Sequence, residues 1–278
     1  SVKIHPFNPN IVYVAAIGQP FKPNKERGIY KTTDGGKTWK KIFFISEKIG
    51  IVDLEFSPDN PNTIYAASWE VNRKPWTIIS GSEKGGIYKS TDEGKTWIKL
   101  KKGLPEGNIG KIDLAVSKSD PDRLYVLLEA DNNKGGVYVS YDRGKKFKAM
   151  SHRKELVNRP FYYCNIYAHP NNADIVYSNA NKFMLSQDAG ENWELKSTPH
   201  GDNHDIWINP ENDNIWIQSN DGGGNVTFNS GKTWTTQFNQ PTAEIYQVEV
   251  DNQYPYWLYG GQQDNYSTVS VPSLPPYP

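Results

Sequence analysis

The sequence predicts an all-β fold built from repeated four-stranded antiparallel units. Two observations support this prediction. A polar turn phrase recurs between short β-rich runs, and a second turn phrase, rich in Asn and Pro, recurs out of phase with it. Short β-branched and aromatic runs bounded by such clusters are typical of strands joined by tight turns.

The first phrase places Ser or Thr, then Asp or Asn, then Gly, then an aromatic residue at fixed offsets. Its copies occupy residues 32–39, 90–97, 140–147, 186–193 and 227–234. Small polar side chains bond the backbone of a hairpin turn, Gly accepts a positive φ, and the closing ring packs in the next strand. Because one active site would need such aspartates once, their repetition favours a structural role over a catalytic one. The residues with this structural role are Asp34, Asp92, Asp142, Asp188, Trp39, Trp97, Trp193 and Trp234.

The second phrase is a turn that leads into a hydrophobic strand. Its copies occupy residues 5–13, 57–65, 117–125, 169–177 and 209–216, with a degenerate copy at 251–259. Pro and Asn before β-branched and aromatic residues are typical of a turn that enters a strand. An alternating run such as residues 51–56 precedes each copy and predicts a further strand.

One unit therefore contains four antiparallel strands in a repeat of roughly 40 to 60 residues, which is typical of a β-propeller blade. The units span approximately residues 1–44, 50–101, 109–151, 161–198 and 203–238, with a partial sixth at 244–270. A propeller must close to hide its edge strands. We therefore expect a single domain over residues 1–278 that is a fragment of a longer chain, with further blades or a partner covering its open edges.

Composition narrows the possible partners. The formal net charge is zero, so no basic field favours nucleic acid or an anionic membrane surface. No apolar run approaches the roughly 20 residues that a membrane helix needs. The single cysteine, Cys164, precludes an internal disulfide and is expected in the core. We expect no nucleic acid partner, no membrane insertion, no cofactor and no bound metal.

Candidate chemistry lies where the repeat is broken. Residues 198–207 bring together His200, Asp202, His204 and Asp205. These side chains suit a metal site or an acid–base pair if they converge, but we favour a hydrogen-bonded polar cluster at the mouth of the channel. If residues 204–208 form the innermost strand, His204 and Ile206 share one face and Asp205 and Trp207 share the other.

Three other stretches suit ligand contacts. Residues 260–265 place four polar side chains after a strong strand, and residues 220–225 are similar and rich in Gly. Residues 69–76 form an insertion in the second unit in which two Trp flank charged residues, and residues 159–163 are comparable. Exposed aromatic rings beside amide and Arg side chains would offer a binding platform for a sugar or a peptide. The alternative is structural: the rings pack in the core, and the amides hydrogen-bond the backbone of their own loop.

The chain resembles proteins with BNR, or Asp-box, repeats in a sortilin-like, glycosyl hydrolase-like group of secreted bacterial proteins. The stretches that carry the resemblance are residues 26–39, 73–76, 198–207, 220–223, 239–243 and 259–265. The resemblance implies a propeller of about seven or more blades, Asp-box turns remote from the ligand site, and a secreted, cell-surface or periplasmic location. The arginines show no sign of the triad that a sialidase of this kind needs.

The favoured function is a noncatalytic extracellular binding module that recognises a glycan, or a peptide or protein, on its channel face. The expected ligand contacts are His200, His204, Gln262, Gln263, Asn265, Trp69, Arg73 and Trp76. The first alternative is a glycoside hydrolase with paired carboxylates. Its candidate carboxylates are Asp202, Asp205, Asp221 and Asp264. The second alternative is a structural subunit of a surface or secretion assembly.

Overall fold

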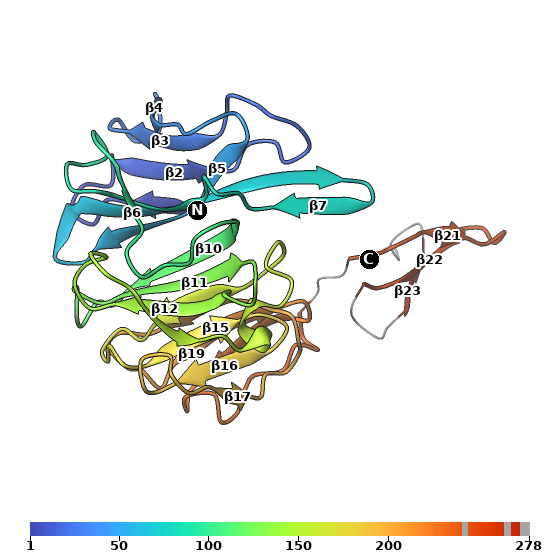
Figure 1. Cartoon of the computed structure of the whole chain (residues 1–278). Helices are drawn as coiled ribbons and strands as arrows, with labels where there is room; N and C mark the ends of the chain where they lie inside the picture. The colour runs from blue at the N-terminus through green and yellow to red at the C-terminus, as the bar shows by residue number, and fades with distance from the viewer. Residues whose placement is uncertain (241–243, 264–267, 273–278) are drawn as a thin grey trace.

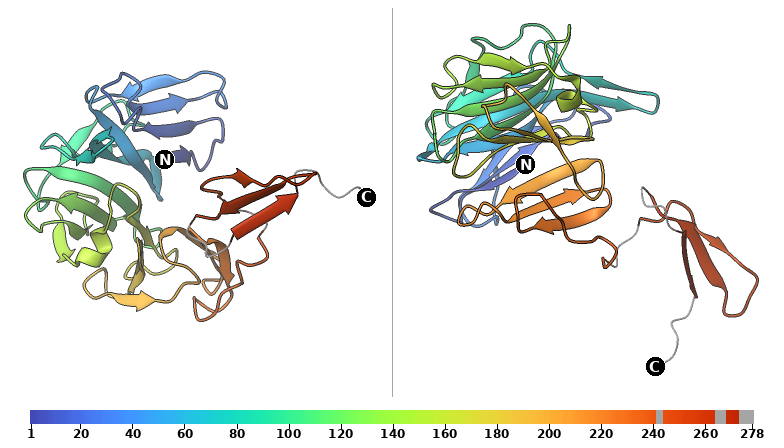
Figure 2. Two further views of the ribbon diagram at one scale, coloured as in Figure 1. Left: turned by 90° about the vertical axis from the view of Figure 1, so that its right-hand side faces the viewer. Right: turned by 90° about the horizontal axis from the view of Figure 1, so that it is seen from below.

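The structure is a computed structural model that describes residues 1–240, 244–263 and 268–272. It contains six antiparallel sheets that follow one another along the chain, together with one short 3-10 helix, η1 (Lys154–Val157). The all-β prediction is confirmed. Figure 2 shows the first five sheets side by side in an arc around a common centre, so each is one blade of a propeller.

The first four sheets have the predicted four-stranded meander (Figure 1). The first contains β1 (Val2–Ile4), β2 (Val12–Ala16), β3 (Gly28–Thr32) and β4 (Lys40–Phe43). The second contains β5 (Ile49–Ser57), β6 (Asn60–Lys74), β8 (Gly86–Ser90) and β9 (Ile98–Leu100), and β7 (Thr77–Ser80) pairs with the extended end of β6. The third contains β10 (Ile109–Val116), β11 (Leu124–Ala130), β12 (Gly136–Ser140) and β13 (Lys148–Ser151). The fourth contains β14 (Asn165–Ala168), β15 (Val176–Asn179), β16 (Phe183–Ser186) and β17 (Glu194–Lys196).

The last two sheets have three described strands each. The fifth contains β18 (Asn203–Ile208), β19 (Trp216–Asn220) and β20 (Gly223–Thr227), and the sixth contains β21 (Glu249–Val250), β22 (Trp257–Gly261) and β23 (Thr268–Pro272). Four strands were predicted for the fifth blade, and this detail is wrong. The N–H of Thr235 donates to the carbonyl of Val226 at 2.9 Å, but the N–H of Val226 donates to the side-chain hydroxyl of Thr235 at 3.0 Å, so the reciprocal backbone bond of a ladder is not made.

The cores lie between neighbouring blades. Ile29 and Leu54 pack between the first and second blades, Leu114 and Leu128 between the second and third, and Ile166 between the third and fourth. All are almost completely buried. Each such side chain contributes on the order of 1.5–3 kcal/mol through burial. Face-to-face packing of successive sheets therefore stabilises the arc.

Every copy of the polar turn phrase shares the contacts of its Asp or Asn Oδ1, whereas the indole bond to the turn Gly occurs only in the first, second and fourth copies. In the first copy, Oδ1 of Asp34 accepts the N–H of Thr38 at 2.9 Å and the hydroxyl of Thr32 at 2.7 Å, and Trp39 Nε1 donates to the carbonyl of Gly36 at 3.0 Å. In the second, Gly94 has a φ of +85°, and a Cβ there would meet Ile42 Cδ1 at 2.7 Å. The carboxylates therefore act within their own turns.

Candidate functional site

The most prominent departure from the repeat is the hairpin formed by the end of β6 and by β7. It projects from the second blade (Figure 1) and is built by pairing from Val71–Ser80 to Lys74–Thr77. Its root is fixed by Arg27, which is fully buried and donates from Nη2 to the carbonyls of Gln19 at 2.9 Å and Val71 at 3.1 Å. A buried guanidinium thus ties the first blade to the hairpin.

Two tryptophans of this insertion have different environments. Trp76 occupies the hairpin turn and is exposed, as a binding platform requires. Trp69 is buried, and its Nε1 donates to Ser80 Oγ at 2.9 Å, while Ser80 donates to Glu129 at 2.6 Å. Trp69 is therefore not the exposed ring that the sequence predicted for a binding platform, because its side chain is buried and its Nε1 is bonded to Ser80 in β7.

A cavity of about 620 Å³ lies beside the hairpin. Its walls come from four separate segments: Phe21 from the first blade, Arg73 from the hairpin, Glu129 from β11, and Phe161 from the loop before β14. Phe21 and Phe161 are exposed, so their rings are available to a ligand. The predicted residue Arg73 therefore lies beside the exposed rings of Phe21 and Phe161.

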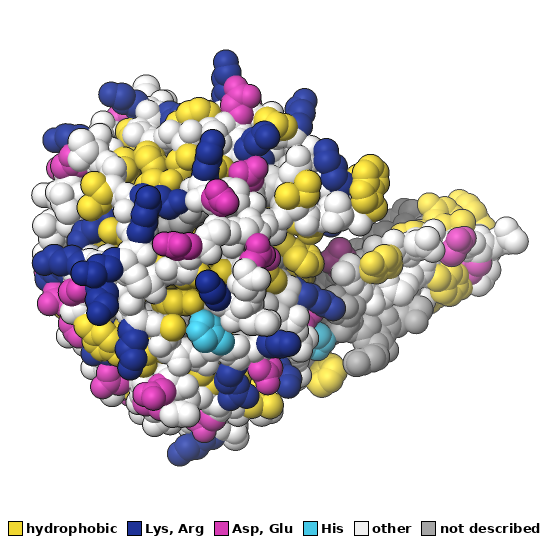
Figure 3. All heavy atoms as spheres, in the orientation of Figure 1, with side chains coloured by type: hydrophobic (Ala, Val, Ile, Leu, Met, Phe, Trp, Pro, Cys, Tyr) yellow, Lys and Arg dark blue, Asp and Glu magenta, His cyan; other side chains and the backbone are white. Residues whose placement is uncertain are grey.

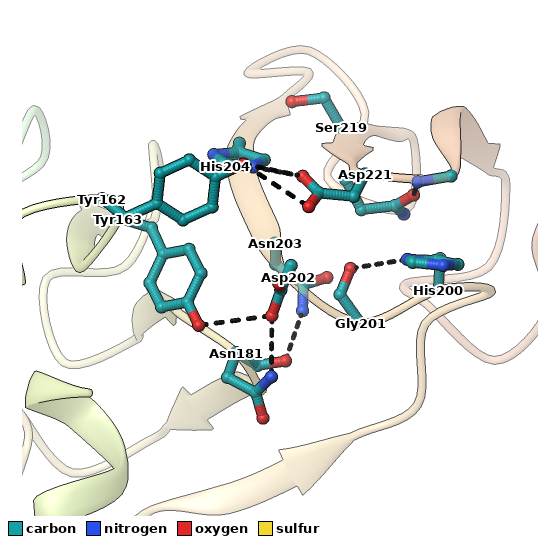
Figure 4. Close-up of polar contacts among 12 residues, drawn as sticks. Tyr162, Tyr163, Asn181, His200, Gly201, Asp202, Asn203, His204, Ser219 and Asp221 are labelled. Carbon is teal, nitrogen blue, oxygen red and sulfur yellow. Dashed lines mark hydrogen bonds and ion pairs between the residues drawn. The ribbon is translucent and has the colours of Figure 1, made fainter. Parts of the chain in front are cut away.

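A polar cluster lies at the start of the fifth blade and includes Tyr162 from the loop before β14 (Figure 4). His204 Nε2 lies 2.6 Å from Asp221 Oδ1. The Tyr162 ring packs edge-on against the His204 imidazole with centroids 5.1 Å apart, and its hydroxyl lies 3.4 Å from Asp221 Oδ2. Because Tyr162 follows Phe161 directly, the loop before β14 contributes to both the cavity and the cluster. We name the cavity walls and the cluster together the loop face: Phe21, Arg73, Glu129, Phe161, Tyr162, His204 and Asp221.

Asp202 lies next to this cluster and is held from several sides. Its Oδ1 accepts the Asn181 amide at 2.7 Å and the Tyr163 hydroxyl at 3.2 Å, and Arg159 lies 3.7 Å from Oδ2. Burial, together with the nearby Asp202 charge, raises the pKa of Tyr163 to about 12. Tyr163 therefore stays a hydroxyl donor at neutral pH.

The remaining predicted residues are dispersed. His200 lies in the loop before β18, with Nδ1 3.0 Å from the carbonyl of Gly201 (Figure 4). Asp205 lies in β18 and is exposed. Gln262 and Gln263 follow β22 in the last sheet, which stands apart from the arc (Figure 2). Asp264 and Asn265 lie outside the described residues.

The stretch around Asp221 also holds a buried amide network. Gln218 donates to Asn203 at 2.6 Å, Asn220 donates to Gln218 at 2.8 Å, and Gln237 donates to both Asn220 and Asn225 at 2.6 Å. These amides satisfy one another, as buried polar groups must. They fix the backbone on both sides of Asp221, and their role at this site is to position it.

Sequence reasoning missed Phe21, Glu129, Tyr163 and Asn181. Phe21 and Glu129 belong to different blades and meet the hairpin only after the arc has formed, so local patterns carry no signal for them. Tyr163 stood within the singled-out stretch at residues 159–163, whose aromatic composition was the available signal.

Other site types find little support in the part of the chain that the structure describes. Among these residues, no group of three or more His, Cys, Asp or Glu side chains is arranged to hold a metal ion. The same residues include no helix long and apolar enough to cross a membrane. On the face drawn in Figure 3, basic and acidic side chains are interspersed.

Comparison with known proteins supports the repeat and the fold. Residues 30–41 match the family model described as the BNR/Asp-box repeat. The chain is 31% identical over 88 residues to a probable oligoxyloglucan-reducing end-specific xyloglucanase from Neosartorya fischeri, an alignment that covers 28% of this chain and 9% of that protein. The chain thus carries a BNR/Asp-box repeat.

Solved structures resemble the whole chain. An ancestral GH74 enzyme matches with a TM-score of 0.61 and 16% identity over 97% of this chain and 40% of its own. The GH74 xyloglucanase from Xanthomonas campestris matches with a TM-score of 0.55 and 13% identity over 95% of this chain and 45% of its own. The chain therefore spans less than half the length of each of these proteins. At these identities the likeness establishes the fold.

Proposed function

We propose that this chain is a noncatalytic, extracellular β-propeller module that binds a glycan on the loop face. The observation that carries the proposal is the cavity of about 620 Å³ between the hairpin and the loop before β14, with Phe21, Arg73 and Phe161 in its walls. The loop that supplies Phe161 to this cavity also supplies Tyr162 to the polar cluster with His204 and Asp221. The loop face therefore combines apolar rings with fixed polar groups.

This combination suits a carbohydrate. The C–H surface of a sugar ring packs on an aromatic face, while its hydroxyls need both donors and acceptors. Arg73 supplies donors and Glu129 supplies acceptors within the cavity. A concave site with apolar walls and a few convergent polar groups is the usual form of a ligand site. An extended peptide is the second ligand class that this surface fits.

The comparisons add support of a weaker kind. The protein from Neosartorya fischeri is named as a probable xyloglucanase, and the aligned solved structures are GH74 enzymes. We extend from these names the expectation of a glucan ligand. The secreted location is part of the same proposal and rests on the resemblance of the repeats to those of secreted proteins.

A glycan array probed with the purified chain tests the proposal, followed by calorimetry with the strongest glycan. We expect Phe161→Ala and Arg73→Ala each to weaken binding at least about fivefold, because aromatic and Arg side chains dominate recognition sites. Phe228→Ala is the matched control, since Phe228 is an exposed ring in the outer turn phrase of the fifth blade. An equal loss in the control, or binding only to peptides, would reject the glycan.

The hydrolase alternative retains one specific observation. Asp221 lies in the polar cluster and Asp202 lies next to it, with the backbone N–H of Asp221 donating to the carbonyl of Asp202 at 3.3 Å. Paired carboxylates across a cleft are the machinery of glycoside hydrolysis. Release of reducing ends from a glucan by the wild-type chain, lost in both Asp202→Asn and Asp221→Asn, would establish hydrolysis and refute a noncatalytic role.

A further inference from the structure

The innermost strands of neighbouring blades are joined by a repeated hydrogen bond. Oδ2 of Asp53 in β5 accepts the backbone N–H of Leu114 in β10 at 3.1 Å. Oδ2 of Asp113 in β10 accepts the N–H of Ile166 in β14 at 2.8 Å. In the second and third blades, one carboxylate therefore reaches to the backbone of the next blade.

The register of this contact is constant. Asp53 lies four residues before Ser57 and Asp113 four residues before Ser117, the residues that open the Asn-Pro turns. Asn165 has the same place before His169, and its amide donates to the carbonyl of His204 in β18 at 2.7 Å. The side chain at this position thus contacts the next blade even where Asn replaces Asp.

Asp205 occupies the same position in the fifth blade, four residues before Asn209. Its Oδ1 accepts the N–H of Ile206 at 2.8 Å, just as Asp53 accepts the N–H of its own neighbour Leu54. Asp53 is buried by the third blade, whereas Asp205 is exposed. Trp207 and Ile217, which are cross-strand partners, are exposed on this blade as well.

The last sheet has a residue at the donor position that matches the Asp205 acceptor. The N–H of Asp251 donates to the carbonyl of Trp257 at 3.3 Å, as the N–H of Asn209 donates to Ile215 at 3.0 Å. Asp251 therefore opens a turn of the same kind, and Val248 stands three residues before it. This is the position of Leu114 and Ile166, whose N–H groups bond the preceding blade.

Burial at this position differs sharply between the sheets. In the second to fifth blades its residues are at most 5% exposed: Leu54, Leu114, Ile166 and Ile206. Val248 is 60% exposed, and Val250 on the same face is exposed too. The last sheet and the fifth blade therefore each expose an apolar face to water. The corresponding faces are covered at the earlier junctions between blades.

We propose that the sheet β21–β23 docks on the open face of the fifth blade, with the N–H of Val248 donating to the carboxylate of Asp205. Docking covers Trp207 and Ile217 with Val248 and Val250 and extends the arc by one blade. It continues the interface already present between the second and third blades and between the third and fourth. The occupant is a segment of this same chain, held nearby by its connection to the fifth blade.

Residue-resolved hydrogen exchange on the full chain tests this. We expect the Val248 amide to exchange at least tenfold more slowly in the wild type than in Asp205→Ala. Asp205→Asn should keep most of the protection, because its amide oxygen still accepts. Glu249→Ala is the matched control, since Glu249 is exposed on the other face of the strand and should leave Val248 unaffected. The Ile166 amide, bonded to Asp113, reports that the earlier blades stay folded in every variant.

Three results would overturn the proposal. The first is a Val248 amide that exchanges at the unprotected rate in the wild type. The second is slow exchange that is the same in Asp205→Ala. The third is protection found only in a species of twice the monomer mass, which would place the sheet on a second copy of the chain.

Discussion

His204 Nε2 lies 2.6 Å from Asp221 Oδ1, and the two residues belong to different segments of the fifth blade, one in β18 and one in the turn after β19. The Asp221 side chain is only 11% exposed, so water cannot fully replace its partner. The pair therefore fixes the turn against the strand, on the side of the blade where we place the ligand.

Removing the imidazole should destabilise the fold. We expect His204→Ala to lower the free energy of unfolding by about 1–3 kcal/mol, because a nearly buried carboxylate loses its close partner. Urea denaturation measures this. Tyr162→Phe is the control: its hydroxyl lies 3.4 Å from Asp221, and its loss should cost less than about 0.5 kcal/mol. Equal costs for the two variants would contradict the assigned pairing.

The polar turns should accept Asn in place of Asp. In the fifth copy Asn229 already accepts the N–H of Thr233 at 2.9 Å and donates to its hydroxyl at 2.8 Å. Asp92 has the matching partner Thr96. We therefore expect the urea midpoint to fall roughly twice as far for Asp92→Ala as for Asp92→Asn. An equal loss with Asn and with Ala would show that the negative charge is essential.

The same turns should make the stability of the fold depend on pH in acid. Hydrogen bonds from Thr38 and Thr32 lower the pKa of Asp34 to about 2, below its ordinary value of 3.8. A depressed folded-state pKa stabilises the fold above pH 3.8, and this contribution is lost as the pH falls toward 2. The stability difference between the wild type and Asp34→Asn should shift against the wild type across that window. A pH-independent difference would argue against the assignment.

Cys164 should be inert in the folded protein. Its thiol is buried, donates to the carbonyl of Asn158 at 3.1 Å, and has its pKa raised to about 12 by that burial. Because the thiolate is the reactive form, labelling by iodoacetamide at pH 8 should be at least ~tenfold slower in the native chain than in denaturant. Rapid native labelling would show that the loop before β14 opens readily.

The polar turns show how far local sequence reaches. Asp34 and Thr38 are four residues apart, so the turn can be predicted from its own residues, and the repetition of the turn predicts the four-stranded sheet. The fourth strand expected in the fifth blade is not formed, and this was not predictable from the sequence. It depends on whether the N–H of Val226 donates to the side-chain hydroxyl or to the backbone carbonyl of Thr235. The burial of Trp69 was likewise hidden, since its partner Ser80 lies in β7 and Ser80 in turn donates to Glu129 in β11.

The sequence by itself determined the repeat, the strand order within a blade and the structural role of the aspartates in the polar turn phrase. Hydrogen bonds between residues four apart and alternating burial along a strand are local effects. Only the tertiary structure decided which non-repeated side chains meet. Packing of separate segments brings Phe21, Arg73 and Phe161 into one cavity and places His204 beside Asp221. Residue spacing along the chain carries no information about such contacts until neighbouring blades stack and bring the loops at their ends together.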